Sequence, residues 1–185
     1  MTALDPERLL RTLVDHEVEF CVIGAVAAWL QGNPSVTLDL DVMPRRELGN
    51  ADRLAAALNA LAARPRGGER GTELEGSDFL GWETQGFDTD AGPIDVVPHA
   101  AAIGGFEEVA TIELALGEFS VRVIKIDEVI ASKEQLGRPK DTAALPALYA
   151  TREALRQRRG SGTGGLAGDA RHSDQRLPGH APRAV

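Results

Sequence analysis

The sequence predicts an α/β or α+β domain in which helices flank a mixed central sheet. Short apolar runs typical of strands alternate irregularly with segments of helical periodicity, an order that favours a sheet covered by helices. Hydrophobic residues make up 43% of the 185-residue chain, enough for a core, and the length fits one domain. Because aromatic residues make up only 4%, Leu, Val, Ile and Ala must fill that core.

The N-terminal segment predicts a helix followed by a strand. Asp5 and Pro6 suit the N-cap and the first helical position of a helix over residues 5–16. The apolar run "EFCVIG" then predicts a strand that turns directly into a helix at Gly24. The apolar stripe of the first helix consists of Leu9, Leu10, Leu13 and Val14.

The next segments predict a helix, a strand and a second helix. The helix covers residues 25–32 and is closed by Gly32, and the strand covers residues 35–44. Residues 50–63 follow as a helix with Asn50 as its cap. The apolar face of that helix consists of Leu54, Ala57, Leu58 and Leu61.

The middle of the chain predicts extended structure after a loop. Residues 65–77 are polar and Gly-rich, which indicates a loop, and residues 79–90 are expected to be extended. "PIDVVPH", residues 93–99, predicts a strand after a turn at Ala-Gly. Residues 111–124 predict a hairpin around Gly117.

Two helices and a tail complete the chain. The first helix covers residues 127–136 and ends at Gly137; the second covers residues 138–159, where we expect Pro146 to disturb it. The structured domain is predicted to span residues 1–158. Residues 159–185, rich in Gly, Pro and Arg, predict a disordered tail that contains two histidines, which we interpret as solvated filler rather than metal ligands: His172 and His180.

Charge and composition restrict the function classes. Residues 151–185 carry seven Arg and three acidic residues, whereas the formal net charge of the chain is −8, so residues 1–150 carry about −12. Such an acidic body disfavours broad nucleic-acid binding, although it permits a small anionic ligand whose charge is neutralised by metal ions. No run approaches the roughly 18 apolar residues of a membrane span, we expect no secretory signal, and Cys21 has no second cysteine in the sequence to pair with. We therefore expect a cytoplasmic protein with no membrane partner.

Two aspartates interrupt the predicted strand "TLDLDVMP". Side chains alternate along a strand, so Asp39 and Asp41 are expected on one face and Leu38, Leu40 and Val42 on the other. Two close carboxylates repel, and a divalent cation offsets that repulsion most directly because Mg²⁺ prefers oxygen ligands. A solvated polar face on an edge strand is the simpler alternative.

A third acid and a glycine extend this pattern. Asp95 lies within the apolar run "GPIDVVP", and on a neighbouring strand it would join the pair, although it could equally be a surface acid near a turn. Three carboxylates on adjacent strands can hold two metal ions roughly 3.5–4 Å apart. Gly24, at a strand–helix junction, would present backbone amides to a phosphate.

The segment "VIGAVAAWLQGNPSVTLDLDV" resembles the signature of the polymerase-β-like nucleotidyltransferase superfamily, a Gly-led helix followed by Asp-x-Asp on the next strand. "VRVIKIDEVIASKEQLGRPKD" resembles the C-terminal helix of small bacterial members, including abortive-infection and toxin–antitoxin nucleotidyltransferases. The resemblance covers about residues 7–150. It implies a minimal nucleotidyltransferase fold, two Mg²⁺ or Mn²⁺ ions on Asp39, Asp41 and Asp95, and catalysis at the same acids.

The resemblance also implies a nucleotide site. Lys133 follows Ile126, Val129 and Ile130 at helical spacing, so it either snorkels from an apolar stripe or points at an anion in a cleft. The resemblance assigns it to the triphosphate, with Asp141 holding it. The remaining residues assigned to the nucleotide are Gly24, Ala25, Arg138 and Lys140, of which the last two could also be solvated loop charges.

Two positions depart from the pattern. Ala25 stands where active members have Ser or Gly, and Ser35 stands where many have Arg. The leading hypothesis is therefore transfer of a nucleoside monophosphate from an NTP to tRNA, a protein or a small molecule. The alternative is a catalytically weak or inactive module that binds a nucleotide or a partner. A toxin with a cognate antitoxin is a third interpretation.

Overall fold

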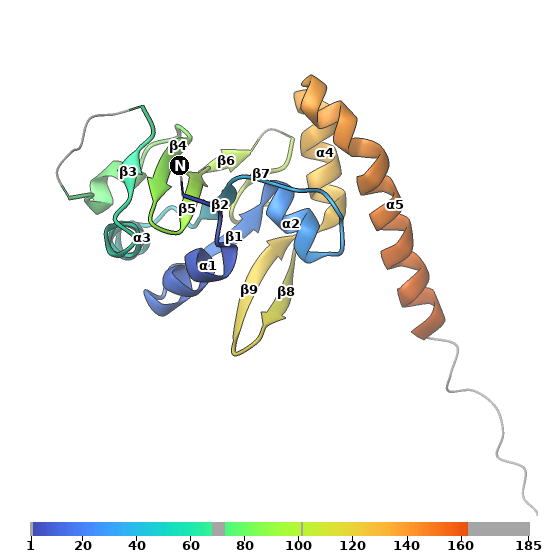
Figure 1. Ribbon diagram of the computed structural model, residues 1–185, viewed down its shortest axis with the longest axis horizontal. Coiled ribbons are helices and arrows are strands. Elements are labelled where there is room, and N and C mark those ends of the chain that lie inside the picture. Colours follow the sequence, from blue (N-terminus) through green and yellow to red (C-terminus); the bar gives the residue numbers. More distant parts are fainter. Residues whose placement is uncertain (1, 68–72, 101, 163–185) are drawn as a thin grey trace, which may run out of the picture.

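The computed structural model describes residues 2–67, 73–100 and 102–162. Within them, seven strands form one mixed sheet in the order β3–β4–β5–β2–β1–β9–β8 (Figure 1). The fold class predicted from the sequence is confirmed. The strands of this sheet are β1 (Phe20–Ile23), β2 (Leu40–Pro44), β3 (Arg64–Pro65), β4 (Gln85–Thr89), β5 (Gly92–Val96), β8 (Thr111–Leu116) and β9 (Phe119–Ile124). A separate small hairpin pairs β6 (His99–Ala100) with β7 (Gly104–Gly105).

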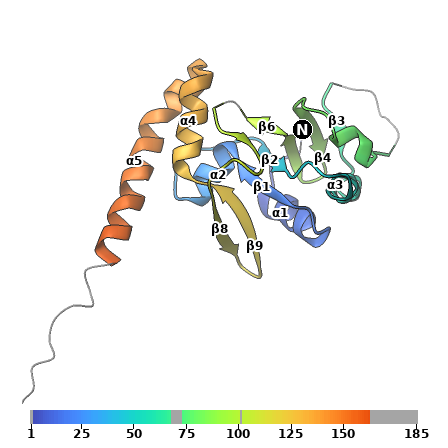
Figure 2. The same cartoon turned by 180° about the vertical axis from the view of Figure 1, so that it is seen from behind.

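The helices form two groups around the sheet. Figures 1 and 2 show α1 and α3 toward one side of the molecule and α2, α4 and α5 toward the other. Contacts join α1 to α3, α2 to α4, and α4 to α5. Their bounds are α1 Pro6–Asp15, α2 Gly24–Leu30, α3 Leu48–Ala60, α4 Ile126–Leu136 and α5 Pro139–Gly162, with a short 3₁₀ helix at Gly76–Phe79. No helix among the described residues is long and apolar enough to cross a membrane.

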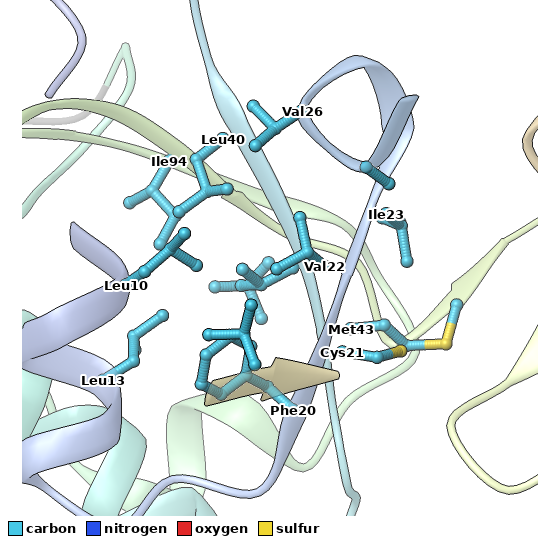
Figure 3. Close-up of a cluster of buried hydrophobic side chains, with 14 of the residues drawn as sticks. Leu10, Leu13, Phe20, Cys21, Val22, Ile23, Val26, Leu40, Met43 and Ile94 are labelled. Atoms are coloured by element: carbon cyan, nitrogen blue, oxygen red, sulfur yellow. The ribbon is translucent and has the colours of Figure 1, made fainter. Parts of the chain in front are cut away.

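The centre of the sheet is the strand β2. It pairs antiparallel with β1 and parallel with β5, and β9 pairs parallel with β1 on the far side. A buried apolar cluster packs against these strands (Figure 3), in which Leu10 and Leu13 of α1 lie close to Phe20 of β1. Cys21 is fully buried in the same cluster, and burial raises the pKa of its thiol to about 12. The central strands are therefore fixed by apolar packing that leaves the thiol protonated.

Several element boundaries agree with the sequence pattern. Asp5 caps α1 by accepting a hydrogen bond from the Arg8 backbone N–H at 3.0 Å. Gly137 ends α4 in the left-handed conformation, and Gly117 turns the β8–β9 hairpin with φ +65°. Each of these residues supplies a backbone conformation or a side-chain acceptor that the local turn requires.

The strand predicted over residues 35–44 was too long. β2 begins only at Leu40, and before it Val36 and Leu38 are 90% and 69% exposed. The prediction that Leu38 shares the buried face of Leu40 was therefore wrong. The reason is a missing partner: Ile23 pairs with Asp41, and at the next residue the chain of β1 has already turned into α2. Residues before Leu40 have no strand on that side to bond to.

One further local prediction was wrong, and the disturbance expected at Pro146 does not end its helix. Asn50 does not cap α3, which begins at Leu48; it lies inside the helix and is fully buried. Pro146 lies within α5 without ending it. Helix α5 packs against α4, and Leu148, two residues after the proline, is buried. Tertiary packing thus compensates for the backbone hydrogen bond that proline cannot donate.

The remaining differences concern the loop and the tail. β3 and the 3₁₀ helix lie within the stretch expected to be loop or extended, and only residues 85–89 of the predicted extended segment form a strand. Helix α5 continues to Gly162, past the predicted domain boundary at residue 158. The rest of the predicted tail, including His172 and His180, lies outside the described residues.

Asn50 connects three backbone groups. Its side chain accepts from the Glu19 N–H (2.7 Å) and donates to the carbonyls of Glu19 and Arg45 (2.8 Å each). We expect Asn50→Ala to lower the free energy of unfolding by about 2–3 kcal/mol, because it leaves these groups without partners. Denaturant unfolding measures the effect. The exposed change Asp52→Ala on the same helix should cost about 0.5 kcal/mol or less, and equal losses in both variants would contradict the assignment.

Candidate active site

One cleft of about 650 Å³ opens between the start of α2, residues 33–39, the β2–β5 pair and the α4–α5 junction. Two of its acidic residues lie on β2 and β5, and its lysines lie on α4 and α5. The cleft brings together all nine residues that the sequence singled out: Gly24, Ala25, Asp39, Asp41, Asp95, Lys133, Arg138, Lys140 and Asp141. Their roles in binding and catalysis remain predictions.

The acidic cluster is built on a parallel strand pair. Asp41 of β2 lies directly opposite Asp95 of β5 in the register, and Ile23 lies opposite Asp41 on the other side. Paired residues on neighbouring strands are only about 5 Å apart, so the two side chains share one region of the sheet. Sheet topology alone therefore brings together two carboxylates that are 54 positions apart in the sequence.

Gly24 lies against this cluster. It adopts φ +66°, and a Cβ atom built on it would lie 2.1 Å from Asp41 Oδ2. The backbone of the β1–α2 turn thus passes so close to the Asp41 carboxylate that no side chain fits between them. Glycine is required here for two reasons, the left-handed conformation and the close approach.

Asp39 reaches the cleft differently from the sequence prediction. It precedes β2, so strand alternation does not place it beside Asp41. Instead the Thr37 hydroxyl donates to Asp39 Oδ1 at 3.0 Å and to the Asp39 carbonyl at 3.1 Å. Upstream, Asn33 donates to Thr151 Oγ1 of α5 at 3.0 Å and accepts from the Ser35 N–H at 3.0 Å. A hydrogen-bonded turn anchored to α5 therefore holds Asp39.

Burial and repulsion from neighbouring carboxylates raise the pKa of Asp41 and of Asp95. Burial, followed by the charges of Asp39 and Asp95, raises the pKa of Asp41 to about 7, against the opposing charges of Lys133 and Lys140. Burial also raises the pKa of Asp95, while the Arg66 guanidinium beside it acts in the opposite direction. Without a cation in the cleft, Asp41 thus holds its proton up to near-neutral pH.

A second charged group joins α4 to α5. Asp141 is fully buried, and its carboxylate accepts from Lys133 Nζ at 3.1 Å, the contact that the resemblance implies, and from Arg138 Nε at 2.5 Å. These hydrogen bonds, that of Arg138 first, lower the pKa of Asp141. The Lys133 side chain is only 18% exposed, so it points into the cleft rather than snorkelling to solvent. Asp141 fixes the position of its ammonium group.

The sequence reasoning missed three residues that shape this site. Thr37 and Asn33 fix the segment that carries Asp39, and the Asn-Pro pair at residues 33–34 was the signal for a turn there. Arg66 was also missed. Its Nη2 atom lies 2.9 Å from Asp95 Oδ1, although it comes from the Gly-rich segment predicted to be loop. No local pattern indicates this contact, since it depends on sheet order.

The cluster has the donor chemistry of a Mg²⁺ or Mn²⁺ site, because carboxylate oxygens are the ligands these ions prefer. Within residues 2–67, 73–100 and 102–162, however, no three His, Cys, Asp or Glu side chains are already arranged around a metal position. Thr37 holds Asp39, and Arg66 holds Asp95. Asp95 Oδ1 is buried and accepts no hydrogen bond from the described residues, since its contact with Arg66 is an ion pair without hydrogen-bond geometry. The donor set fits a divalent cation once these side chains rearrange.

Solved structures of similar fold come from antibiotic-modifying proteins. No family model matches the chain, and no curated protein matches its sequence. The lincosamide antibiotic adenylyltransferase LnuA, bound to lincomycin, superposes with a TM-score of 0.54 at 11% identity, over 81% of this chain and 99% of LnuA. The antibiotic-resistance factor ANT(2'')-Ia superposes with a TM-score of 0.51 at 14% identity, over 84% of this chain and 91% of that one. The chain therefore has the nucleotidyltransferase fold.

The raised pKa of Asp41 has a consequence for stability. Between the unfolded pKa near 3.8 and the folded pKa near 7, the folded state holds the proton that the unfolded state loses, so stability falls as pH rises. We expect the melting temperature of Asp41→Asn to exceed that of the wild type by a few degrees more at pH 8 than at pH 5. Both proteins are melted with a chelator present, because a bound cation would neutralise Asp41. An identical difference at both pH values would contradict the assignment.

The close approach at Gly24 is tested with a matched glycine. Gly117 has nearly the same φ, +65° against +66°, but a Cβ on Gly117 meets nothing within 4 Å. Gly117→Ala should cost about 1 kcal/mol of backbone strain, whereas Gly24→Ala should cost a further 1–3 kcal/mol or so because its methyl group overlaps Asp41. Denaturant unfolding compares the two variants. Equal losses would show that only the backbone conformation matters.

Proposed function

We propose that this chain is a metal-dependent nucleotidyltransferase that transfers a nucleoside monophosphate from an NTP to a hydroxyl-bearing acceptor. The observation that carries the proposal is the in-register pairing of Asp41 with Asp95, with Asp39 and the Gly24 turn in the same cleft. The similar fold of LnuA, which is named an adenylyltransferase, supports the proposal. So does the complex of ANT(2'')-Ia with adenylyl-2''-tobramycin, which superposes with a TM-score of 0.50 at 13% identity, over 83% of this chain and 95% of that one.

In this proposal, the acidic and basic groups divide the work. Asp39, Asp41 and Asp95 would hold one or two Mg²⁺ or Mn²⁺ ions, and such ions would supply positive charge for the phosphates and for the attacking oxygen. Lys133, held by Asp141, donates hydrogen bonds to the triphosphate. The Gly24 and Ala25 amides at the start of α2, together with Arg138 and Lys140, add donors and positive charge at the same cleft.

The transfer step balances with these groups. The acceptor oxygen forms a bond to the α-phosphorus of the NTP, and the bond from that phosphorus to the bridging oxygen breaks, so pyrophosphate leaves. The proton of the attacking hydroxyl goes to Asp95, whose raised pKa suits a proton acceptor better than a fully solvated carboxylate would. The Lys133 ammonium lies 3.1 Å from Asp141 Oδ1, which fixes its position in the cleft.

The net charge of residues 1–150 bears on the class of acceptor. With about −12 on residues 1–150, the body suits a small neutral or cationic molecule better than tRNA, whose phosphates need many basic contacts. A protein acceptor is compatible with the same chemistry, and the toxin–antitoxin role implied by the resemblance stays a prediction. Growth arrest on expression that Asp41→Ala abolishes would favour it, and so would capture of a cognate antitoxin.

A second candidate function is nucleotide binding without turnover. Ala25 favours it, because Ala25 lines the cleft with a methyl group where a hydroxyl could contact a phosphate. A turnover assay with candidate acceptors separates the two functions, since both bind a nucleotide but only one releases pyrophosphate.

The test of the leading function uses NTPs labelled at the α-phosphate with Mg²⁺ or Mn²⁺. We expect Asp41→Asn and Asp95→Asn each to lower turnover by about 10²–10⁴-fold, the usual loss on removing a catalytic acid or base. Glu113→Gln, an exposed charge change on β8, should leave turnover unchanged. Equal calorimetric binding of Mg²⁺–NTP by the wild type and by the double variant Asp39→Ala/Asp41→Ala would contradict the proposed site.

A further inference from the structure

Arg66 is the one described residue in direct ionic contact with Asp95. Its Nη2 atom lies 2.9 Å from Asp95 Oδ1, and the Asp95 side chain is 20% exposed against 42% for Arg66. The oxygen it contacts is buried and has no hydrogen-bond donor among the described residues. The pair thus consists of a carboxylate inside the cleft and a guanidinium that reaches it from the rim.

The fold places Arg66 at Asp95 through two strands. Directly after β3, the Arg66 backbone N–H donates to the Gly86 carbonyl of β4 at 2.7 Å. Gly86 in turn is the register partner of Asp95 on β5. Arg66 is therefore anchored two strands away from Asp95, and its side chain crosses β4 at the glycine.

Gly86 leaves the space in which this pair forms. A Cβ atom built on it would lie 3.0 Å from Asp95 Oδ1 and 3.2 Å from both Arg66 Cζ and Nη1. The φ of Gly86 is not in the left-handed region, so the backbone does not itself require glycine there. The space above Gly86 is filled instead by the Arg66 guanidinium.

A guanidinium and a divalent cation compete for the same oxygen. Asp95 Oδ1 is buried, so a metal ion reaches it only after Arg66 withdraws, and two neighbouring positive charges repel strongly where solvent is excluded. We propose that Arg66 occupies Asp95 Oδ1 in the cation-free protein and must withdraw from it before a divalent cation binds, so that Arg66 lowers the affinity of the acidic cluster for the cation. This inference rests on the proposed function.

The withdrawn arginine has a second carboxylate nearby. Arg66 Nε already lies 3.9 Å from Asp88 Oδ1 of β4, and the Asp88 side chain is 54% exposed. A move toward Asp88 exchanges a partly buried ion pair for a solvated one, and solvated pairs differ little in free energy from separated charges. The competition therefore adjusts cation affinity without abolishing it.

The opposite role predicts the opposite result. If Arg66 merely positioned Asp95 for the metal, its removal would leave the carboxylate free to rotate, and cation binding would weaken. If Arg66 competes, its removal tightens binding. The sign of the change in Mn²⁺ affinity separates a competing residue from a positioning one.

The experiment is a calorimetric titration of the full chain with Mn²⁺ alone. We expect Arg66→Gln and Arg66→Ala to bind Mn²⁺ roughly three- to tenfold more tightly than the wild type, as a partly buried ion pair implies. Arg64→Gln removes the same charge two residues away from an exposed position on β3, and it should change affinity by less than about twofold. Arg66→Lys, which keeps the competing charge, should bind like the wild type. Melting curves confirm that each variant is folded. Arg66→Gln and Arg66→Ala remove the same charge, so either one completes the test if the other does not fold.

The outcomes separate this inference from the proposed function. Asp41→Asn establishes that Mn²⁺ binds at the acidic cluster. Binding by the wild type that Asp41→Asn abolishes, together with no tightening in either neutral Arg66 variant beyond Arg64→Gln, overturns the inference alone. Binding by the Arg66 variants where the wild type shows none supports it strongly. No binding by any of these proteins overturns both the inference and the proposed metal site.

Discussion

The parallel pairing of β2 with β5 is the constraint on which the rest of this structure depends. It sets Asp41 opposite Asp95 in the cleft, where burial and the charges of Asp39 and Asp95 disfavour the ionised form of Asp41. The surrounding features each reduce the free-energy cost of placing these carboxylates close together. Gly24 has no side chain and so leaves room for the Asp41 carboxylate, Arg66 supplies a positive charge to Asp95, and Asp41 keeps its proton to near-neutral pH.

The positively charged side chains at the cleft pair with carboxylates that differ in burial. Lys133 and Arg138 both bind the buried Asp141, so α4 and α5 meet through a charge network with few alternative arrangements. Arg66, by contrast, comes from the rim and has a solvated alternative in Asp88. On the proposed function, the lysine held by Asp141 would receive the phosphate and Arg66 would make room for the metal ion.

The fold is shared with structures at 11–14% identity, so a similar backbone arrangement forms from mostly different side chains. One fold can carry different functions, because function depends on the residues of the site and not on the fold alone. In this chain the rim includes Val36 and Leu38, two exposed apolar residues that precede β2 in the turn anchored to α5. Differences in acceptor between proteins of this fold are expected to lie in such segments.

The sequence by itself determined the fold class, most elements and the residue types of the site. Apolar periodicity, the Asp5 cap and the glycines at positions 117 and 137 are local signals, and local physics is enough to interpret them. Only the tertiary structure decided that β2 starts at Leu40, that Asn50 is buried in three hydrogen bonds, and that Arg66 reaches Asp95. Each of these depends on which strand lies beside which, and no pattern within a single segment contains that information.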